Sequence, residues 1–181
     1  LALTCLIVLG ASRAAAQDRE APPATQLPAP AEPPYRLTVG ERLGFHGRWF
    51  GIPVGHGWIE VKEIVDLDGR PAYLIELQGR TNDVLSKLYP IQDVLRSYVD
   101  VQTLRPLRFE KDQREGHYRA HEVVTFDHAR RIATYRSLLN DSVKEIPLPE
   151  DFQDLLSALY WFRAQPVPPV GGLLSVQLYT D

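Results

Sequence analysis

The sequence predicts a mainly β domain, an antiparallel meander curled into an incomplete barrel with one helix packed on it. Three observations predict this fold. Apolar and polar residues alternate along successive segments between residues 42 and 139, which is the period of strands with one buried face. Turn-forming residues such as Asp68-Gly69 separate these segments. One stretch, residues 151–164, instead has apolar residues at helical spacing.

The segment from residue 40 to residue 61 contains the clearest pair of strands. Its alternating apolar side chains are Leu43, Phe45, Trp49, Ile59 and Val61. Gly51, Pro53 and Gly55 lie between the two runs, and such residues end or bend a strand. We therefore expect a β-hairpin or a sharply bent pair of strands here.

Further strands are expected along the chain. Residues 57–66 and 71–80 flank the Asp68-Gly69 turn and predict a second hairpin. A helical turn that ends at Pro90 is expected in the next segment. The same alternation predicts strands at 91–101, 106–112, 118–126 and 130–139. In the first of these, Asp93 and Ser97 interrupt the apolar face.

The run between Pro149 and Pro166 predicts the helix. Its apolar side chains recur every three or four residues: Phe152, Leu155, Leu156, Leu159 and Phe162. Glu150, Asp151 and Asp154 lie near its start, where carboxylates complement the helix dipole. We expect this helix, over residues 151–164, to cover the open end or the concave face of the curled sheet. Another strand is expected within residues 173–180.

The N-terminal part of the chain predicts export. Residues 1–9 form an uncharged apolar run of signal-peptide length, shorter than the roughly 20 residues of a membrane span. Ala14-Ala15-Ala16 follows as a cleavage site, so residues 1–16 are expected to be a signal peptide and the protein to be periplasmic, without a membrane span after cleavage. Residues 17–34 hold six prolines and are expected to be a disordered linker before a domain over 35–181.

Cysteine and charge content exclude several classes of site and partner. Cys5, the single cysteine, lies in the expected signal peptide, so neither a disulfide nor a thiolate metal site is expected in the mature chain. Removing residues 1–16 takes Arg13 from the 20 basic residues and nothing from the 23 acidic ones, which leaves a net charge of −4. This balance argues against nucleic acid as a partner.

The residues around the candidate metal and nucleotide motifs argue against both kinds of site. His117 and His121 have the i, i+4 spacing of zinc ligands on a helix, but the alternation around them predicts a strand, in which the rings lie too far apart. Gly51, Gly55 and Gly57 do not form a dinucleotide fingerprint, because no helix follows them. No metal, cofactor or catalytic residue is assigned.

Aromatic residues of the predicted strands and helix are the candidates for a ligand site. In a small half-barrel such side chains either line a cavity or fill the core. The residues assigned to the site are Phe45, Trp49, Tyr73, Tyr118, Tyr135 and Trp161.

Several short motifs carry a family resemblance. They are Gly40-Glu41-Arg42-Leu43, Trp49-Phe50-Gly51-Ile52-Pro53-Val54-Gly55, Leu88-Tyr89-Pro90, Thr103-Leu104-Arg105-Pro106, Arg114-Glu115-Gly116 and Leu159-Tyr160. In these motifs, residues 38–181 resemble the bacterial exported family known as domain of unknown function 3108. The resemblance implies export, a β-rich fold and further strands beyond the end of this chain, which is therefore expected to be truncated. It supplies no catalytic residues.

The leading functional hypothesis is a non-enzymatic periplasmic module that binds a lipid or another apolar envelope component, or that serves in envelope maintenance. One alternative is an envelope glycan hydrolase with carboxylates such as Glu115 or Glu122 in acid and base roles. Another alternative is a scaffold that docks partners through exposed strand edges.

Overall fold

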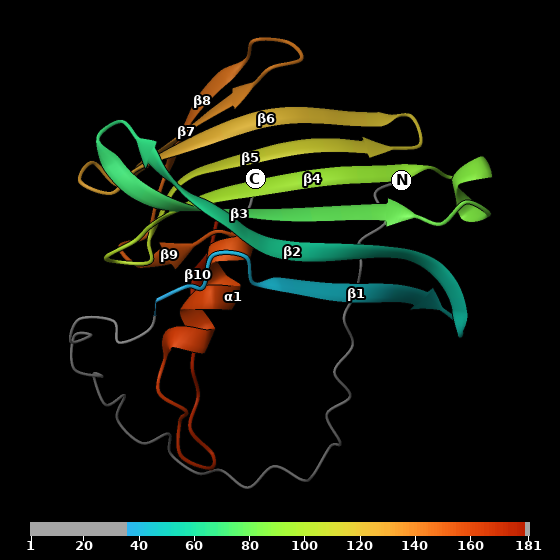
Figure 1. The fold of residues 1–181 in the computed structure, drawn as a ribbon. Helices are drawn as coiled ribbons and strands as arrows, with labels where there is room; N and C mark the ends of the chain where they lie inside the picture. Colours follow the sequence, from blue (N-terminus) through green and yellow to red (C-terminus); the bar gives the residue numbers. More distant parts are fainter. Residues whose placement is uncertain (1–35, 180–181) are drawn as a thin grey trace, which may run out of the picture. The chain divides into compact units, whose positions relative to one another are not determined.

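The computed structural model describes residues 36–179, and the expected signal peptide and linker lie outside this range. Eight strands form one antiparallel sheet in chain order (Figure 1). They are β1 (Arg42–Trp49), β2 (Ile52–Leu67), β3 (Arg70–Thr81), β4 (Ile91–Asp100), β5 (Pro106–Glu115), β6 (Tyr118–Asp127), β7 (Ile132–Ser137) and β8 (Val143–Pro147). The predicted antiparallel meander is confirmed. Within residues 36–179 the sheet ends at β1 and β8 and does not close into a barrel.

The remaining elements are small. They are the 3-10 helix η1 (Leu85–Lys87), β9 (Phe152–Gln153), the helix α1 (Leu155–Ala164) and β10 (Gln177–Leu178). The helical turn before Pro90 is therefore confirmed. The predicted helix boundary is wrong at its start, since Phe152 belongs to β9, which pairs in parallel with β10. Within residues 36–179, no helix combines the length and apolar character that crossing a membrane requires.

Two of the hairpins have two-residue turns in which both central residues have positive φ angles. Asp68 and Gly69, between β2 and β3, have φ angles of 55° and 83°. Phe50 and Gly51, between β1 and β2, have φ angles of 46° and 80°. Positive φ at both central residues is the requirement of a type I′ turn, which favours Asp-Gly, Asn-Gly or Gly-Gly. The two turns therefore share their geometry, but only the β2–β3 turn uses a favoured pair.

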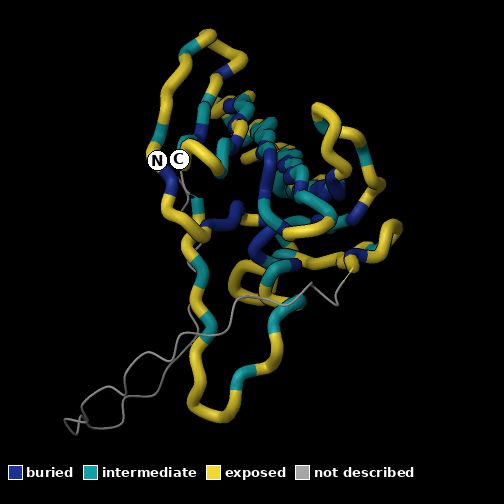
Figure 2. The backbone as a smooth tube through the Cα atoms, turned by 90° about the vertical axis from the view of Figure 1, so that its left-hand side faces the viewer, coloured by how far each residue is buried: buried dark blue, intermediate teal, exposed yellow. Residues whose placement is uncertain are grey.

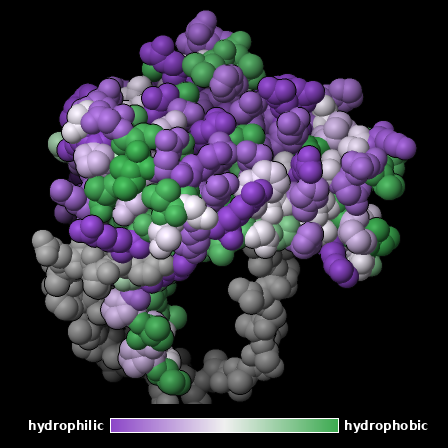
Figure 3. Space-filling view, in the orientation of Figure 1, coloured by the Kyte–Doolittle hydropathy of each residue, from purple (hydrophilic) through white to green (hydrophobic). Residues whose placement is uncertain are grey.

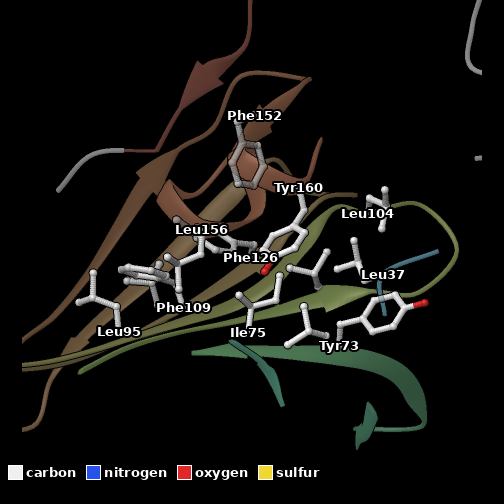
Figure 4. Packing of buried hydrophobic residues seen from close by; sticks show 14 of the residues in the cluster. Leu37, Tyr73, Ile75, Leu95, Leu104, Phe109, Phe126, Phe152, Leu156 and Tyr160 are labelled. Atoms are coloured by element: carbon white, nitrogen blue, oxygen red, sulfur yellow. The ribbon is translucent and has the colours of Figure 1, made fainter. Parts of the chain in front are cut away.

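The core lies between one face of the sheet, which we call the helix-side face, and the segment containing β9 and α1 (Figures 1 and 2). Figure 4 shows Leu156 and Tyr160 of α1 among sheet residues that include Ile75 and Phe126. The other buried members are Leu37, Val61, Tyr73, Leu95, Val99, Leu104, Phe109, Val124, Ala133, Leu148 and Phe152.

The predicted apolar stripe of the helix is partly wrong. Leu155 and Phe162 are 56% and 40% exposed, whereas Leu156 and Tyr160 are 1% and 0% exposed. Ser157 is buried as well. The side of α1 that faces the sheet is therefore not the side that carries the apolar stripe. The reason is the cap at the start of the helix, which fixes the rotation of α1 against the sheet.

Asp154 forms this cap and is fully buried. Its Oδ1 accepts hydrogen bonds from the backbone N–H groups of Leu156 and Ser157, both at 2.8 Å. Its Oδ2 accepts a hydrogen bond of 2.5 Å from Ser97 Oγ of β4. Burial raises the pKa of Asp154, although the hydrogen bonds from Ser157, Ser97 and Leu156 act in the opposite direction. One carboxyl group thus begins the helix and joins it to the middle of the sheet.

The far end of α1 is tied to the first strands. Arg163 Nη1 lies 2.6 Å from Glu41 Oε1, and the carbonyl of Glu41 accepts a hydrogen bond from Val61 N of β2. The helix therefore crosses from β4 toward β1 and β2 over one end of the sheet. In Figure 1 the right-hand parts of β1 to β6 extend beyond α1 and β9.

Candidate ligand-binding face

The helix-side face beyond α1, which we call the open half, carries apolar residues on one side and polar residues on the other. Strand alternation and pairing place Phe45 opposite Gly57, Gly57 opposite Gly79, and Gly79 opposite Asp93. Its apolar side lies on β1 to β4 and comprises Leu43, Phe45, Leu77 and Leu95. Its polar side lies on β4 to β7 and comprises Asp93, Lys111, Gln113, Glu115, Glu122 and Tyr135.

Glycine positions leave space beside Phe45. Phe45 is 43% exposed, and its ring covers Gly57, where an added Cβ would lie 2.6 Å from Phe45 Cζ. At Gly79 an added Cβ would meet no atom within 4 Å. The space beside Gly79, which lies between Gly57 and Asp93 in the strand register, is therefore open to an incoming group.

Two carboxyl groups meet on the polar side of the open half. Gln113 Nε2 lies 3.4 Å from both Asp93 Oδ2 and Glu115 Oε1, and donates to each. The backbone N–H of Arg114 donates to Asp93 Oδ1 at 3.1 Å. Partial burial, and then the hydrogen bond and negative charge of Asp93, raise the pKa of Glu115. Glu115 therefore keeps its proton to a higher pH than an exposed glutamate and can donate to its neighbour.

A second cluster of polar side chains, formed by Lys111, Glu122 and Tyr135, lies further along the same face. Lys111 Nζ is 2.9 Å from Glu122 Oε2, and the hydroxyl of Tyr135 donates to Glu122 Oε1 at 2.9 Å. Both charged side chains are largely buried, with 15% and 13% exposure. Lys144 of β8 lies 5.6 Å from the centre of the Tyr135 ring. These contacts hold the Glu122 carboxyl group in place on this face.

The spacing along β5 and β6 separates the two glutamates considered for glycan hydrolysis. Glu115 is opposite Tyr118, and Glu122 is opposite Lys111, so four ladder positions separate them. At roughly 3.3 Å per residue this is roughly 13 Å between backbone positions. Paired carboxyl groups of glycosidases lie roughly 5–9.5 Å apart. Glu115 instead has Asp93 as its partner, within hydrogen-bonding reach.

The aromatic residues assigned from the sequence do not form one site. Phe45 and Tyr135 lie on the open half, and Tyr118, 53% exposed, lies at its rim opposite Glu115. Tyr73 is 4% exposed and belongs to the packed core. Trp49 lies beside the β1–β2 turn, and Trp161 of α1 contacts Phe162 edge-on, with ring centres 5.2 Å apart.

The polar residues of the open half were not predicted as ligand-site residues from the sequence. Asp93 had a visible signal, because it interrupts an apolar strand face. Lys111 and Gln113 had none, since charged and polar residues are ordinary on a strand. Only the pairing of β4 with β5 shows that these side chains share a face with Phe45.

Two surface cavities lie on the opposite face of the sheet. The larger, of about 300 Å³, is lined by Asp112, Arg114, Arg119, His121 and neighbouring residues. The smaller, of about 80 Å³, lies beside Trp58 and Arg80. The larger cavity is charged, whereas sites for small apolar molecules are mainly apolar. Over residues 36–179, no three histidine, cysteine or acidic side chains gather as a metal site would require.

Comparison with known proteins defines the family. No curated protein and no solved structure matches this chain. A family profile described as "Protein of unknown function (DUF3108)" matches residues 35–181, which include the whole sheet, α1 and the open half. The resemblance inferred from the short motifs is confirmed, and the chain belongs to the DUF3108 family.

Proposed function

We propose that this protein is a non-enzymatic binding module of the bacterial cell envelope, exported to the periplasm, whose sheet acts as an incomplete barrel. Its ligand is an amphiphile with an acyl or alkyl chain and a hydroxyl- or ammonium-bearing head group. The observation that carries the proposal is the open half, where side-chain-free space at Gly79 lies between exposed Phe45 and the Asp93–Glu115 pair.

The apolar side of the open half suits the chain of such a ligand. Leu43 and Phe45 are 40% and 43% exposed and share a face with partly buried Leu77, so an alkyl chain laid over them loses contact with water. Each buried methylene contributes about 0.8 kcal/mol. The glycine at position 79 admits the chain close to the backbone.

The polar side suits the head group. Asp93, Gln113 and Glu115 offer carboxyl and amide oxygens that accept from hydroxyl or ammonium donors. These groups lie outside the cluster of buried hydrophobic residues. Perturbed titratable groups of this kind concentrate at functional sites.

Filling the open space is expected to block the ligand. In Gly79→Val the new side chain occupies the area beside Phe45, so the affinity for dodecylamine, measured by titration calorimetry below micelle-forming concentrations, is expected to fall roughly tenfold or more. The unfolding free energy should change by about 1 kcal/mol or less, because valine is favoured in strands.

Gln92→Val is the matched control, since Gln92 is exposed on the opposite face of neighbouring β4. It is expected to leave dodecylamine binding unchanged. The proposal fails if dodecylamine and dodecanoate both show no binding to the unaltered protein. It also fails if Gly79→Val binds dodecylamine as tightly as the unaltered protein does.

Binding is also expected to depend on pH. The raised pKa of Glu115 means that its negative charge appears only at a higher pH than for an exposed glutamate. Dodecylamine stays cationic over this range, so its affinity should increase as the pH rises through that pKa. Glu115→Gln should bind weakly and lack this increase, whereas Glu145→Gln, at an exposed β8 position, should retain it. Equal pH profiles for all three proteins would contradict the assignment of the head-group site.

A further inference from the structure

One end of the sheet carries a group of protruding apolar side chains, which we call the apolar edge. They come from the β1–β2 turn, the β3–β4 loop and the start of β6, and all are more than half exposed: Trp49 (67%), Phe50 (90%), Ile52 (63%), Val84 (77%), Leu88 (83%) and Tyr118 (53%). Figure 3 shows hydrophobic residues at the right of the view, where Figure 1 places the β1–β2 turn and the β3–β4 loop.

Hydrogen bonds join these segments into one continuous edge. Asn82 donates from its side chain to the Pro53 carbonyl at 2.6 Å and from its backbone to the Val54 carbonyl at 3.0 Å. On the other side of the loop, Gly116 N donates to the Pro90 carbonyl at 2.8 Å. The ring of Tyr89 covers Gly116, where an added Cβ would lie 2.7 Å from that ring. The tips are therefore held in place relative to one another.

Phe50 occupies a position that does not favour phenylalanine. Its φ of 46° lies in the left-handed region, which is unfavourable for a bulky side chain. The equivalent position in the β2–β3 turn is Asp68, a residue that tolerates this conformation. With 90% of its surface exposed, Phe50 gains almost no burial in exchange for this strain. Strain without a folding benefit points to a function outside the fold.

The exposed charges around the apolar edge are mainly basic, although the whole chain has a net charge of −3. The exposed basic residues of the adjoining strand ends and loops are Arg48, Arg80, Lys87, Arg114 and Arg119, and Asp83 is an exposed acid among them. Asp93, Asp112 and Glu115 lie behind them and are partly buried, and Arg114 contacts Asp112. The outermost layer is thus a basic rim around apolar tips.

We propose that the apolar edge inserts into the surface of a membrane that contains anionic phospholipids. Tips with one to three apolar residues each fit between lipid head groups, and tryptophan and tyrosine favour the membrane–water interface. Exposed arginine and lysine side chains attract anionic head groups. Apart from Tyr118, which lies at the rim of the open half, the residues of the apolar edge differ from those of the open half, so this inference stands apart from the ligand proposal.

The test measures binding of the full chain to sucrose-loaded vesicles of phosphatidylcholine, with or without phosphatidylglycerol, by co-sedimentation. Phe50→Asn is expected to lower the partition coefficient roughly tenfold on vesicles with phosphatidylglycerol. Its unfolding midpoint in urea should equal or exceed that of the unaltered protein, because asparagine suits a positive φ. Raising the salt concentration to about 0.5 M should weaken the part of binding that depends on phosphatidylglycerol.

Ile64→Thr is the matched control, because Ile64 is 52% exposed near the other end of β2. This variant should bind vesicles like the unaltered protein. The apolar run of residues 1–9 is present in every variant, so only differences between variants are compared. Equal partitioning of Phe50→Asn and the unaltered protein would overturn the proposal. Self-association that is abolished in Phe50→Asn, without vesicle binding, would also overturn it and indicate contact between copies of this chain.

Discussion

Replacing Asp154 with alanine is expected to lower the unfolding free energy by about 3–5 kcal/mol. The substitution removes the acceptor for the N–H groups of Leu156 and Ser157 and for the hydroxyl of Ser97, all in a site without access to water. It also releases the start of α1 from β4. Urea unfolding followed by circular dichroism measures the loss, which corresponds to a decrease in melting temperature of roughly 6–20 °C.

Asp154→Asn is the control for this change. Asparagine is also a favoured N-cap and can accept the same backbone hydrogen bonds, so most of the stability should remain. Because burial raises the pKa of Asp154 in the folded protein, its contribution is complete below the pKa of an unfolded aspartate, about 3.9. This contribution to stability is lost as the pH rises through the raised pKa of Asp154 in the folded protein. The stability of the unaltered protein relative to Asp154→Asn should therefore decrease as the pH rises. A relative stability that increases with pH would contradict the raised pKa of Asp154.

Gly57→Ala is expected to cost about 2–3 kcal/mol of unfolding free energy, the second large effect. The new Cβ would collide with the backbone carbonyl oxygen of Gln78 on β3 and would lie 2.6 Å from the ring of Phe45. The ring can rotate away, but the carbonyl belongs to the strand pairing of β2 with β3. The two strands would have to separate locally, which a decrease in the urea midpoint would report.

Gly79→Ala provides the matched comparison on the neighbouring strand. Gly57 and Gly79 are opposite each other in the register of β2 and β3, yet an added Cβ at Gly79 meets nothing within 4 Å. This variant should therefore unfold at the same urea concentration as the unaltered protein or at a higher one, because alanine restricts the unfolded chain. Equal destabilisation by both substitutions would contradict the close approach of β2 and β3 at Gly57.

Local patterns in the sequence were sufficient for most of the sheet. The turn at Asp68-Gly69 and the alternation of Tyr73, Ile75 and Leu77 predict a strand pair that the structure contains. These signals are local, because a turn fixes the register of its own two strands. The motif from Trp49 to Gly55 likewise was sufficient to indicate the family, whose profile matches residues 35–181.

The rotation of α1 and the residues of the open half could not be predicted from local patterns, because both depend on contacts between residues far apart in the sequence. The apolar stripe predicts a buried Leu155, but the hydrogen bond between Ser97 and Asp154 determines which side of the helix faces the sheet. The interruption of an apolar strand face by Ser97 was visible, although its partner was not. Similarly, no spacing rule places Asp93 beside Glu115, because their strands are joined through a loop whose path the sequence leaves open.

The crossing of α1 over the sheet has a consequence for how the chain folds. The bond between Ser97 and Asp154 spans 57 positions, and the ion pair between Glu41 and Arg163 spans an even longer loop. Contacts of such large sequence separation form late, since the entropy of loop closure is lost before they stabilise the chain. The hairpins can therefore appear early, whereas the hydrophobic face of the sheet stays uncovered until residues 154–163 dock on it.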